Sequence, residues 1–318
     1  MQHISNILCA LHGPEYRLET LQRACSLAIA NQARLEIALL HPEFGQELAA
    51  YLADFKSRML EDLGAAVCDI AIGHGYDGAA FAEAIPIHFF NDKPGFVSVI
   101  EQVVRGSHDL LIKQPQRDNS GKHKKGFKSL DMNLLRKCPC PVWLDRNFTS
   151  QDASRMVIAI EPHTDDTRVH DLNAKLLQIG TECARYLNAR CEILACWEFE
   201  YEGYLRNAPF GKKNSRTEVD KILTETREEH EEALETIIAK AGIERSDVNI
   251  VLERGDPGVA IPRYLKDNSG DMLVMGTLAR SGVPALFIGN TAEDVMQSLR
   301  TSMLAIKPDD FKTPLNVD

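Results

Sequence analysis

Short apolar runs alternate with amphipathic segments along the whole chain. Residues 4–11 and 35–40 are apolar runs of strand length, and between them Leu18, Leu21 and Cys25 recur at helical spacing. This order predicts a strand, a helix and a second strand. Strands that are separated by helices in this way form a parallel sheet with helices on both faces. The pattern therefore predicts an α/β fold.

The same alternation continues to the end of the first half. The further elements that it predicts are a helix at 46–63, a strand at 67–72, a helix at 96–104, a strand at 109–112, and a helix followed by a strand that ends at 144.

The second half repeats this plan. Strands are expected at 156–160, 191–196, 248–252, 272–275 and 303–306, with helices at 172–187, at 217–241, after 257 and from 290. Individual residues repeat too, because Ser107-His108-Asp109 precedes one apolar run and Ser269-Gly270-Asp271 precedes another. We therefore expect two tandem domains, at 1–145 and 155–310, with a polar linker at 146–154 and a tail at 311–318.

Composition limits the classes of function. A length of 318 residues suits two domains, and a formal charge of −10 opposes general nucleic-acid binding. The first residues lack a secretory signal, and no apolar run is long enough to span a membrane, so a cytoplasmic protein without a membrane span is expected. One basic segment, which contains Lys122, Lys124, Lys125 and Lys128, is interpreted as a solvated loop, with a local anion contact as the alternative.

Two groups of residues resemble metal ligands but favour simpler interpretations. Cys138 and Cys140 form a C-x-C sequence without a second pair at finger spacing, which favours a buried strand start over a metal site. The other group is formed by His163, Asp165, Asp166 and His170. Helix capping is favoured there over a divalent ion beside a triphosphate. No metal ligand is therefore assigned.

Five further cysteines fall inside apolar strand or helix patterns and are expected in the core as small hydrophobic residues: Cys9, Cys25, Cys183, Cys191 and Cys196.

The most informative segment is 276–292, which leads from an apolar strand at 271–275 through a glycine-bearing loop into a helix. Asn290 with Glu293 three residues later resembles a capping box. The backbone N–H groups and the dipole at such a helix start favour a negatively charged group. Two interpretations stay open, a phosphate-binding loop and a loop that only turns the chain.

Three segments of the chain resemble the universal stress proteins of the tandem type. They are GSHDLLIK at 106–113, LLRKCPCPVW at 134–143, and GTLARSGVPALFIGNTAEDVMQSLRTSMLAIKPDDFKTP at 276–314. The resemblance implies two open sheets of five parallel strands, of the adenine nucleotide alpha hydrolase-like type, and a part in the stress response. It also implies pairing through the last strands, at 142–144 and 303–306, either within one chain or in a homodimer.

Nucleotide-binding members of this family carry G-x2-G-x9-G-[S/T] after the fourth strand and an acidic residue after the first. Gly276 and Gly289 match the first and third glycines, whereas Ala279 replaces the second and Asn290 replaces the Ser or Thr. Glu161 stands at the acidic position. Met275 and Thr291, beside the matched glycines, complete the expected binding residues.

The first half departs further from this pattern, since His12 stands at the acidic position and Lys113 at the first glycine. A family-type site is therefore expected only in the second half. The ligand that the resemblance implies is ATP or another adenine nucleotide with Mg²⁺, or another phosphorylated molecule.

The function expected is that of a binding and regulatory module. The alternatives are an interaction protein without a nucleotide and a slow ATPase. The sequence lacks a Walker loop and a nucleophile elbow, and we assign no catalytic residue. The aromatic insert at 197–216 is expected to pack on its own domain rather than close over a ligand or bind a partner.

Overall fold

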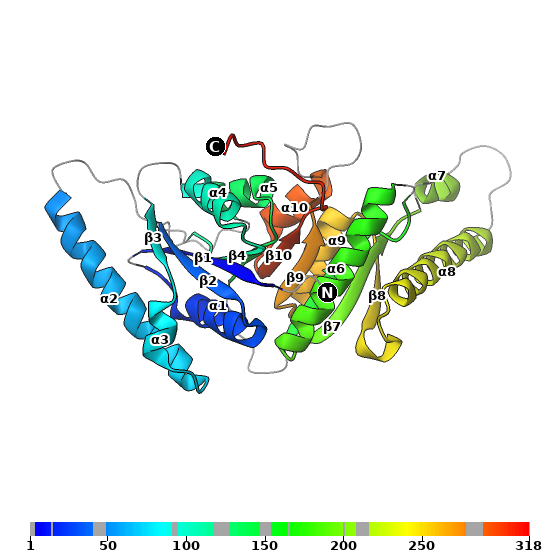
Figure 1. Ribbon diagram of the computed structural model, residues 1–318. Coiled ribbons are helices and arrows are strands. Elements are labelled where there is room, and N and C mark those ends of the chain that lie inside the picture. The colour runs from blue at the N-terminus through cyan, green and yellow to red at the C-terminus, as the bar shows by residue number, and fades with distance from the viewer. Residues whose placement is uncertain are drawn as a thin grey trace. The chain divides into compact units, whose positions relative to one another are not determined.

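The computed structural model describes residues 4–13, 15–40, 49–90, 95–116, 127–146, 154–164, 166–199, 201–207, 216–277 and 289–317. Strands and helices alternate along these residues (Figure 1). They divide into two units. The described residues up to 146 and from 302 onward belong to the first unit, and those at 154–277 and 289–301 belong to the second.

The first unit contains six strands, which are neighbours in the order β3-β2-β1-β4-β5-β10. Its strands are β1 (Asn6–His12), β2 (Arg34–Leu40), β3 (Ile87–Phe90), β4 (Leu110–Lys113), β5 (Val142–Leu144) and β10 (Ser302–Ile306). Its helices are α1 (Leu18–Asn31), α2 (Ala49–Gly73), α3 (Gly78–Glu83), α4 (Gly95–Gly106) and α5 (Ser129–Lys137). α1 packs with α2 and α4 packs with α5. Right-handed crossovers place these two pairs on opposite faces of the sheet, because the chain moves outward from β1 in both directions.

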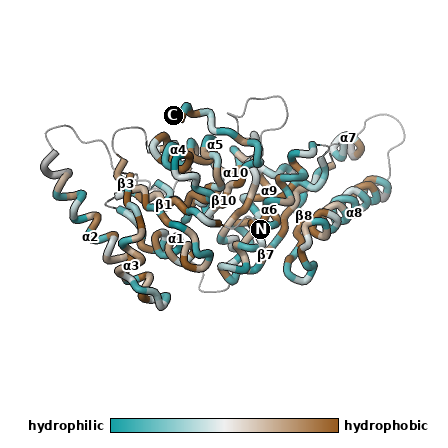
Figure 2. Tube along the Cα trace, viewed as in Figure 1, coloured by the Kyte–Doolittle hydropathy of each residue, from teal (hydrophilic) through white to brown (hydrophobic). Residues whose placement is uncertain are grey.

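The core of the first unit is centred on β1. Residues from Ile7 to Leu11 are all 0% exposed, which is typical of a central parallel strand covered on both faces. The strands of this sheet are largely brown in Figure 2, the colour of hydrophobic residues.

The second unit has the strand order β9-β6-β7-β8. Its strands are β6 (Arg155–Ala159), β7 (Arg190–Trp197), β8 (Asn249–Arg254) and β9 (Met272–Gly276). Its helices are α6 (Thr167–Tyr186), α7 (Glu202–Asn207), α8 (Arg216–Lys240), the 3-10 turn η2 (Arg245–Asp247), α9 (Pro257–Asp267) and α10 (Asn290–Ser298). All of its strand pairs are parallel. The α/β fold with largely parallel sheets is therefore confirmed.

The repeat that the sequence predicts is visible in matching details. Ser107 and Ser269, which precede β4 and β9, both have a left-handed backbone with φ of 52°. The following aspartates act alike as well. Asp109 accepts hydrogen bonds from the backbone N–H groups of Ser5 (2.7 Å) and Asn6 (3.1 Å), and Asp271 accepts one from the N–H of Arg155 (3.0 Å). Each aspartate thus ties the start of a fourth strand to the start of a first strand.

The prediction of a strand at 67–72 is wrong. These residues lie inside α2, and the third strand of the first unit is β3, at Ile87–Phe90. Met59, Leu63, Val67 and Ala71 are buried at intervals of four residues, which is the spacing of one helix face. A short apolar run is compatible with a strand or a buried helix, and here the longer periodic pattern decides.

The last strands of the two halves pair inside the first unit, as the resemblance implies. β10 runs antiparallel to β5, with Met303 opposite Leu144 and Ala305 opposite Val142. All five residues of β10 are buried.

None of the described helices is both long and apolar enough to cross a membrane.

We predict that Asp109→Ala lowers the free energy of unfolding by about 2 kcal/mol, because it removes a carboxylate that accepts two backbone N–H groups. Asp69→Ala, on the exposed face of α2, is the control and should change stability by no more than about 0.5 kcal/mol. Urea unfolding followed by circular dichroism measures both. Equal effects of the two substitutions would show that Asp109 does not hold the two strands together.

Candidate functional site

The second unit has a topological switch point between β6 and β9. The chain passes from β6 through α6 to β7 on one side, whereas β9 lies on the other side of β6 and is reached through α9. Ala159 near the end of β6 pairs with Leu194 of β7 and with Met275 of β9. In open α/β sheets, ligands bind outside the carboxyl ends of the strands at such a point. The predicted residues Glu161, Met275 and Gly276 lie at these strand ends.

Asn173 of α6 fixes the backbone of Glu161. Its side-chain Nδ2 donates to the carbonyl oxygen of Glu161 (2.7 Å), and its Oδ1 faces the N–H of Glu161 at 3.4 Å. Asn173 is buried, so this connection between helix and strand end is shielded from water. The arrangement holds Glu161, which is half-buried, directly beyond β6.

The packing of α6 explains why position 276 is a glycine. A Cβ atom at Gly276 would lie 2.6 Å from Cδ2 of Leu172 and 3.2 Å from its Cγ. Such a contact requires Leu172 to move. Gly276 is therefore accounted for by close packing on α6 even without a ligand. Met275, the preceding residue, is buried in the sheet.

The start of α10 differs from the predicted capping box by one residue. Gly289 is the N-cap, Asn290 is the first helical residue, and none of the described side chains caps the helix. The N–H of Glu293 donates to the carbonyl oxygen of Gly289 (3.0 Å). Gly289 fits the N-cap because glycine is tolerated there. Asn290 and Thr291 therefore lie in the first turn, where backbone N–H groups have no partner within the helix. Ala279 lies outside the described residues.

Thr277 is a candidate residue that the sequence interpretation did not single out. It follows Gly276 at the end of β9 and is 6% exposed. Its hydroxyl Oγ1 has no hydrogen-bond partner among the residues that the structure describes. A buried hydroxyl without a partner is unfavourable unless another molecule supplies the hydrogen bond. Only its place beside a matched glycine could have drawn attention to it.

The acidic segment before α6 forms a helix cap, as favoured from the sequence. Asp166 is the N-cap and accepts hydrogen bonds from the backbone N–H of Arg168 (3.0 Å) and from its guanidinium (2.6 Å). These bonds with Arg168 lower the pKa of Asp166. Asp165 lies outside the described part of the chain. No group of three metal-ligating side chains occurs within the described part.

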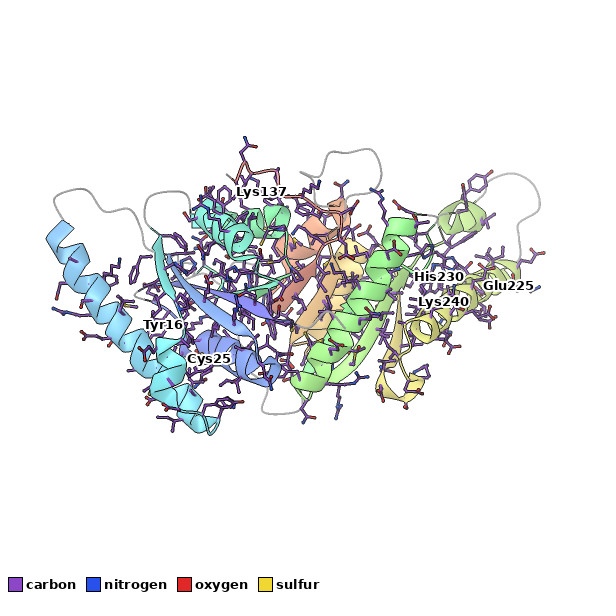
Figure 3. The ribbon with its side chains drawn as sticks, in the orientation of Figure 1. Tyr16, Cys25, Lys137, Glu225, His230 and Lys240 are labelled. Atoms are coloured by element: carbon purple, nitrogen blue, oxygen red, sulfur yellow. The ribbon has the colours of Figure 1, made fainter. Side chains whose placement is uncertain are left out.

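Aromatic rings lie beside the β6 and β7 ends of this edge. The ring of His163 is 4.2 Å from that of His230, which is 6.4 Å from the ring of Trp197. Figure 3 labels His230 on α8. Burial lowers the pKa of His230, which donates from Nδ1 to the carbonyl oxygen of Thr226 (2.8 Å). Trp197 packs with Val219, Leu223, Phe199 and Leu205, so this part of the aromatic insert packs on its own unit, whereas Tyr201 and Tyr204 are exposed.

The corresponding edge of the first unit is occupied by the protein's own charges. Lys113, fully buried at the end of β4, donates from Nζ to Oδ1 of Asp131 (2.6 Å) and to the carbonyl oxygen of Gln114 (2.6 Å). Nζ also lies 3.0 Å from Nε2 of His12, at the end of β1. The other carboxylate oxygen of Asp131 accepts from the N–H of Gln116 (2.9 Å). An internal ion pair thus fills this switch point.

Burial and the adjacent ammonium of Lys113 lower the pKa of His12 from 6.5 to about 4. His12 is therefore neutral at pH 7 and accepts a hydrogen bond from Lys113. Burial also lowers the pKa of Lys113, whereas Asp131 acts to raise it.

The chain is similar in sequence to known proteins. The family model described as "Universal stress protein family" matches residues 211–307. Universal stress protein E of Photorhabdus laumondii subsp. laumondii is 31% identical over 229 residues, which cover 69% of this chain and 68% of that protein.

Solved structures are similar along nearly the whole chain. The crystal structure of a functionally unknown protein from Pseudomonas aeruginosa PAO1 has a TM-score of 0.67 at 25% identity, and the match covers 98% of this chain and 95% of that one. A universal stress protein from Archaeoglobus fulgidus DSM 4304 has a TM-score of 0.52 at 13% identity, over 96% of this chain and 99% of that chain. The second likeness concerns the fold alone.

We predict that Asp131→Asn lowers the free energy of unfolding by about 3 to 5 kcal/mol, because it leaves the buried ammonium of Lys113 without a counter-charge. Asparagine keeps the oxygen that accepts from Gln116. The double variant Lys113→Met, Asp131→Asn should therefore recover most of the loss. Urea unfolding of the three proteins measures this, and an equal loss in the single and double variants would refute the ion-pair explanation.

A second prediction concerns pH. The folded pKa of His12, about 4, is lower than its unfolded pKa of about 6.5, so the unfolded chain binds the extra proton more readily. The stability that neutral His12 contributes is fully present above the pKa of the unfolded chain. It is lost as the pH falls toward the pKa of His12 in the folded chain. Between about pH 7.5 and about pH 5, this loss should be about 2 kcal/mol.

The control for this prediction is His12→Gln, which keeps an acceptor near Lys113 but does not titrate. Urea unfolding at both pH values compares it with the natural chain. The difference between the two proteins isolates His12, since the other histidines titrate in both. The same pH dependence in both would mean that His12 is not the neutral acceptor of the Lys113 hydrogen bond.

Proposed function

The chain belongs to the universal stress protein family, and we propose that its second unit binds an adenine nucleotide or another phosphorylated ligand at the carboxyl edge of β6 and β9. The protein would then act as a stress-response binding and regulatory module whose state depends on that ligand. Catalysis is not part of the proposal.

One observation carries this proposal, the buried hydroxyl of Thr277 at the switch point without a partner among the described residues. It lies at the end of β9, the strand that leads to α10. No described side chain caps the first turn of α10, and backbone N–H groups at such a helix start favour an anion. A phosphorylated ligand would supply a hydrogen-bond acceptor to both.

The proposed roles follow from the positions of the residues. The backbone N–H groups at Gly289, Asn290 and Thr291 would receive phosphate oxygens at the positive end of the α10 dipole. On the other side of the edge, Glu161 would accept hydrogen bonds from ribose hydroxyls, with its backbone held by Asn173. Met275 and Gly276 would line the floor of the site.

A Mg²⁺ ion would accompany a di- or triphosphate. Because the described residues include no cluster of metal ligands, the phosphates and water would supply most of its six oxygen ligands. The exposed ring of His163, which lies beside that of His230, would offer a surface on which the base could stack.

The alternative is an interaction protein that holds no nucleotide. A Cβ atom at position 276 would meet Leu172, which favours this alternative, since packing on α6 accounts for the glycine without a ligand. Ala279, in place of the second family glycine, favours it as well. A slow ATPase is the third candidate, and no described general base supports it.

Further proposals concern organisation. We propose that the repeats at 1–145 and 155–310 are the two domains, joined by 146–154 and followed by a tail at 311–318. Pairing of β5 with β10 within the chain would take the place of a homodimer contact through these strands. The charge of −10 supports a cytoplasmic role without general nucleic-acid binding.

Calorimetric titration of ATP, ADP and cyclic AMP tests the ligand proposal. Thr277→Val keeps the side-chain volume but removes the hydroxyl. We predict that it weakens ATP binding by about 0.5 to 1.5 kcal/mol, or roughly two- to tenfold, while leaving the free protein equally or more stable. Gly289→Val should weaken binding as well, because its side chain hinders the approach of a phosphate to α10.

The matched control is Thr236→Val. Its hydroxyl donates to the carbonyl oxygen of Glu232 on the exposed face of α8. This substitution should leave ATP affinity unchanged. Absence of binding by the natural chain to all three nucleotides would favour the interaction protein, and unchanged affinity in Thr277→Val would place the ligand elsewhere.

A further inference from the structure

The two cysteines of the C-x-C sequence lie side by side in the connection between α5 and β5. Their Sγ atoms are 3.6 Å apart, and both thiols are free. Cys138 ends α5, where its N–H donates to the carbonyl oxygen of Leu134 (2.9 Å). Pro139 and Pro141 follow the two cysteines and restrict the backbone between them. The two sulfur atoms therefore lie next to each other on a restricted backbone.

A buried ammonium group accompanies this pair. Lys307 directly follows β10, is 2% exposed, and donates from Nζ to the carbonyl oxygen of Leu135 in the last turn of α5 (2.7 Å). Burial lowers the pKa of Lys307 to about 8, while charge on Cys138 and Cys140 acts to raise it. The lysine and the two sulfurs therefore form one electrostatic group.

The two thiols have different proton affinities. Burial acts to raise the pKa of Cys138, but the hydrogen bond with Cys140 and the charge of Lys307 outweigh it, so the pKa is lowered. The pKa of Cys140 is raised, first by its hydrogen bond with Cys138 and then by burial. Asp109 also acts to raise it. This arrangement favours a thiolate on Cys138 and a protonated Cys140.

Other cysteines lack this arrangement. Burial raises the pKa of each of the following: Cys9, Cys25, Cys183, Cys191 and Cys196. Four of them are buried as the sequence predicts, and Cys196 is half-buried. Buried thiols of this kind are inert and serve packing. The C-x-C pair differs because a second sulfur and a cation lie next to it.

We propose that Cys138 and Cys140 are an oxidation site that closes an intrachain disulfide on reaction with a hydroperoxide. Cys138 is 0% exposed, so the small and uncharged hydrogen peroxide would reach it past Cys140, which keeps 7% of its surface exposed. Cys138 is the attacking sulfur, Cys140 is the resolving sulfur, and Lys307 stabilises the attacking thiolate.

The reaction balances with one peroxide per pair. Sulfur of the Cys138 thiolate attacks one peroxide oxygen, the O–O bond breaks, and the departing hydroxide takes a proton from solvent to become water. Cys138 is then a sulfenic acid. Sulfur of Cys140 attacks the Cys138 sulfur, the S–O bond breaks, and the hydroxyl leaves with the Cys140 proton as a second water. The two cysteines lose two electrons, and the peroxide gains them.

The disulfide changes the surroundings of Lys307. An S–S bond of about 2.05 Å draws the end of α5 toward the start of β5 and removes the thiolate next to the ammonium. β5 pairs with β10, the strand that Lys307 follows. Oxidation therefore acts on the junction of α5, β5 and β10.

The test begins with the natural full-length chain. It is exposed to limiting hydrogen peroxide, unfolded in an alkylating reagent, digested and measured by mass spectrometry. The peptide with Cys138 and Cys140 should appear first in unalkylated form, lighter by two hydrogen atoms, and a dithiol reductant should restore alkylation. The proposal is overturned if other cysteines oxidise first while both members of this pair stay alkylated.

Variants separate the roles. Cys140→Ser should leave a sulfenic acid on Cys138 that dimedone traps, whereas Cys138→Ser should give neither sulfenic acid nor disulfide at this site. Lys307→Met should slow disulfide formation roughly tenfold, which corresponds to about one unit in the pKa of the attacking thiol. Lys312→Met, at an exposed position of the same tail, is the control and should leave the rate unchanged.

Circular dichroism confirms that each variant is folded before oxidation. An unchanged rate in folded Lys307→Met would remove the lysine from the site. If that variant does not fold, the order of oxidation in the natural chain still decides the proposal.

Discussion

Parallel pairing of the first and fourth strands of each repeat is the constraint on which the rest of the structure depends. β1 pairs with β4 and β6 pairs with β9, and Asp109 and Asp271 tie each pair at its starting edge by accepting backbone N–H groups. The same pairing brings the ends of both strands together at the opposite edge. At that edge, the polar groups that follow the strands need hydrogen-bond or charge partners.

The two units solve this problem differently. In the first, Lys113, Asp131 and His12 satisfy one another within the protein. In the second, Asn173 holds the backbone of Glu161, while the hydroxyl of Thr277 lacks a partner among the described residues and α10 begins without a side-chain cap. Because burying two charges costs desolvation energy, the ion pair adds little net stability. It excludes a ligand because it occupies the switch point. The second edge still has groups that a ligand could satisfy.

The sequence predicted the alternation of strands and helices well, because apolar runs and periodic helix faces are local signals. It failed at 67–72, where the periodic face of α2 extends through a run that resembles a strand. The glycines of the site were found by resemblance, but their physical reasons were not. Only the structure shows that Gly276 faces Leu172 and that Gly289, rather than Asn290, is the N-cap of α10.

Side-chain partners were the least predictable feature. Lys113 and Asp131 are separated by 18 residues, and Lys307 reaches Leu135 across 172 residues of sequence. Burial decides whether such a lysine is a surface charge or an internal one, and burial depends on the whole fold. For the same reason, the partnerless hydroxyl of Thr277 could be recognised only once its surroundings were known.

The central claim is that only one of the two switch points takes a ligand. Equilibrium dialysis of the full chain against radiolabelled ATP with Mg²⁺ counts the nucleotides bound at saturation. The account predicts one nucleotide per chain. Two equivalent nucleotides per chain would contradict the closure of the first unit by Lys113 and Asp131, and none would contradict the ligand site at Thr277.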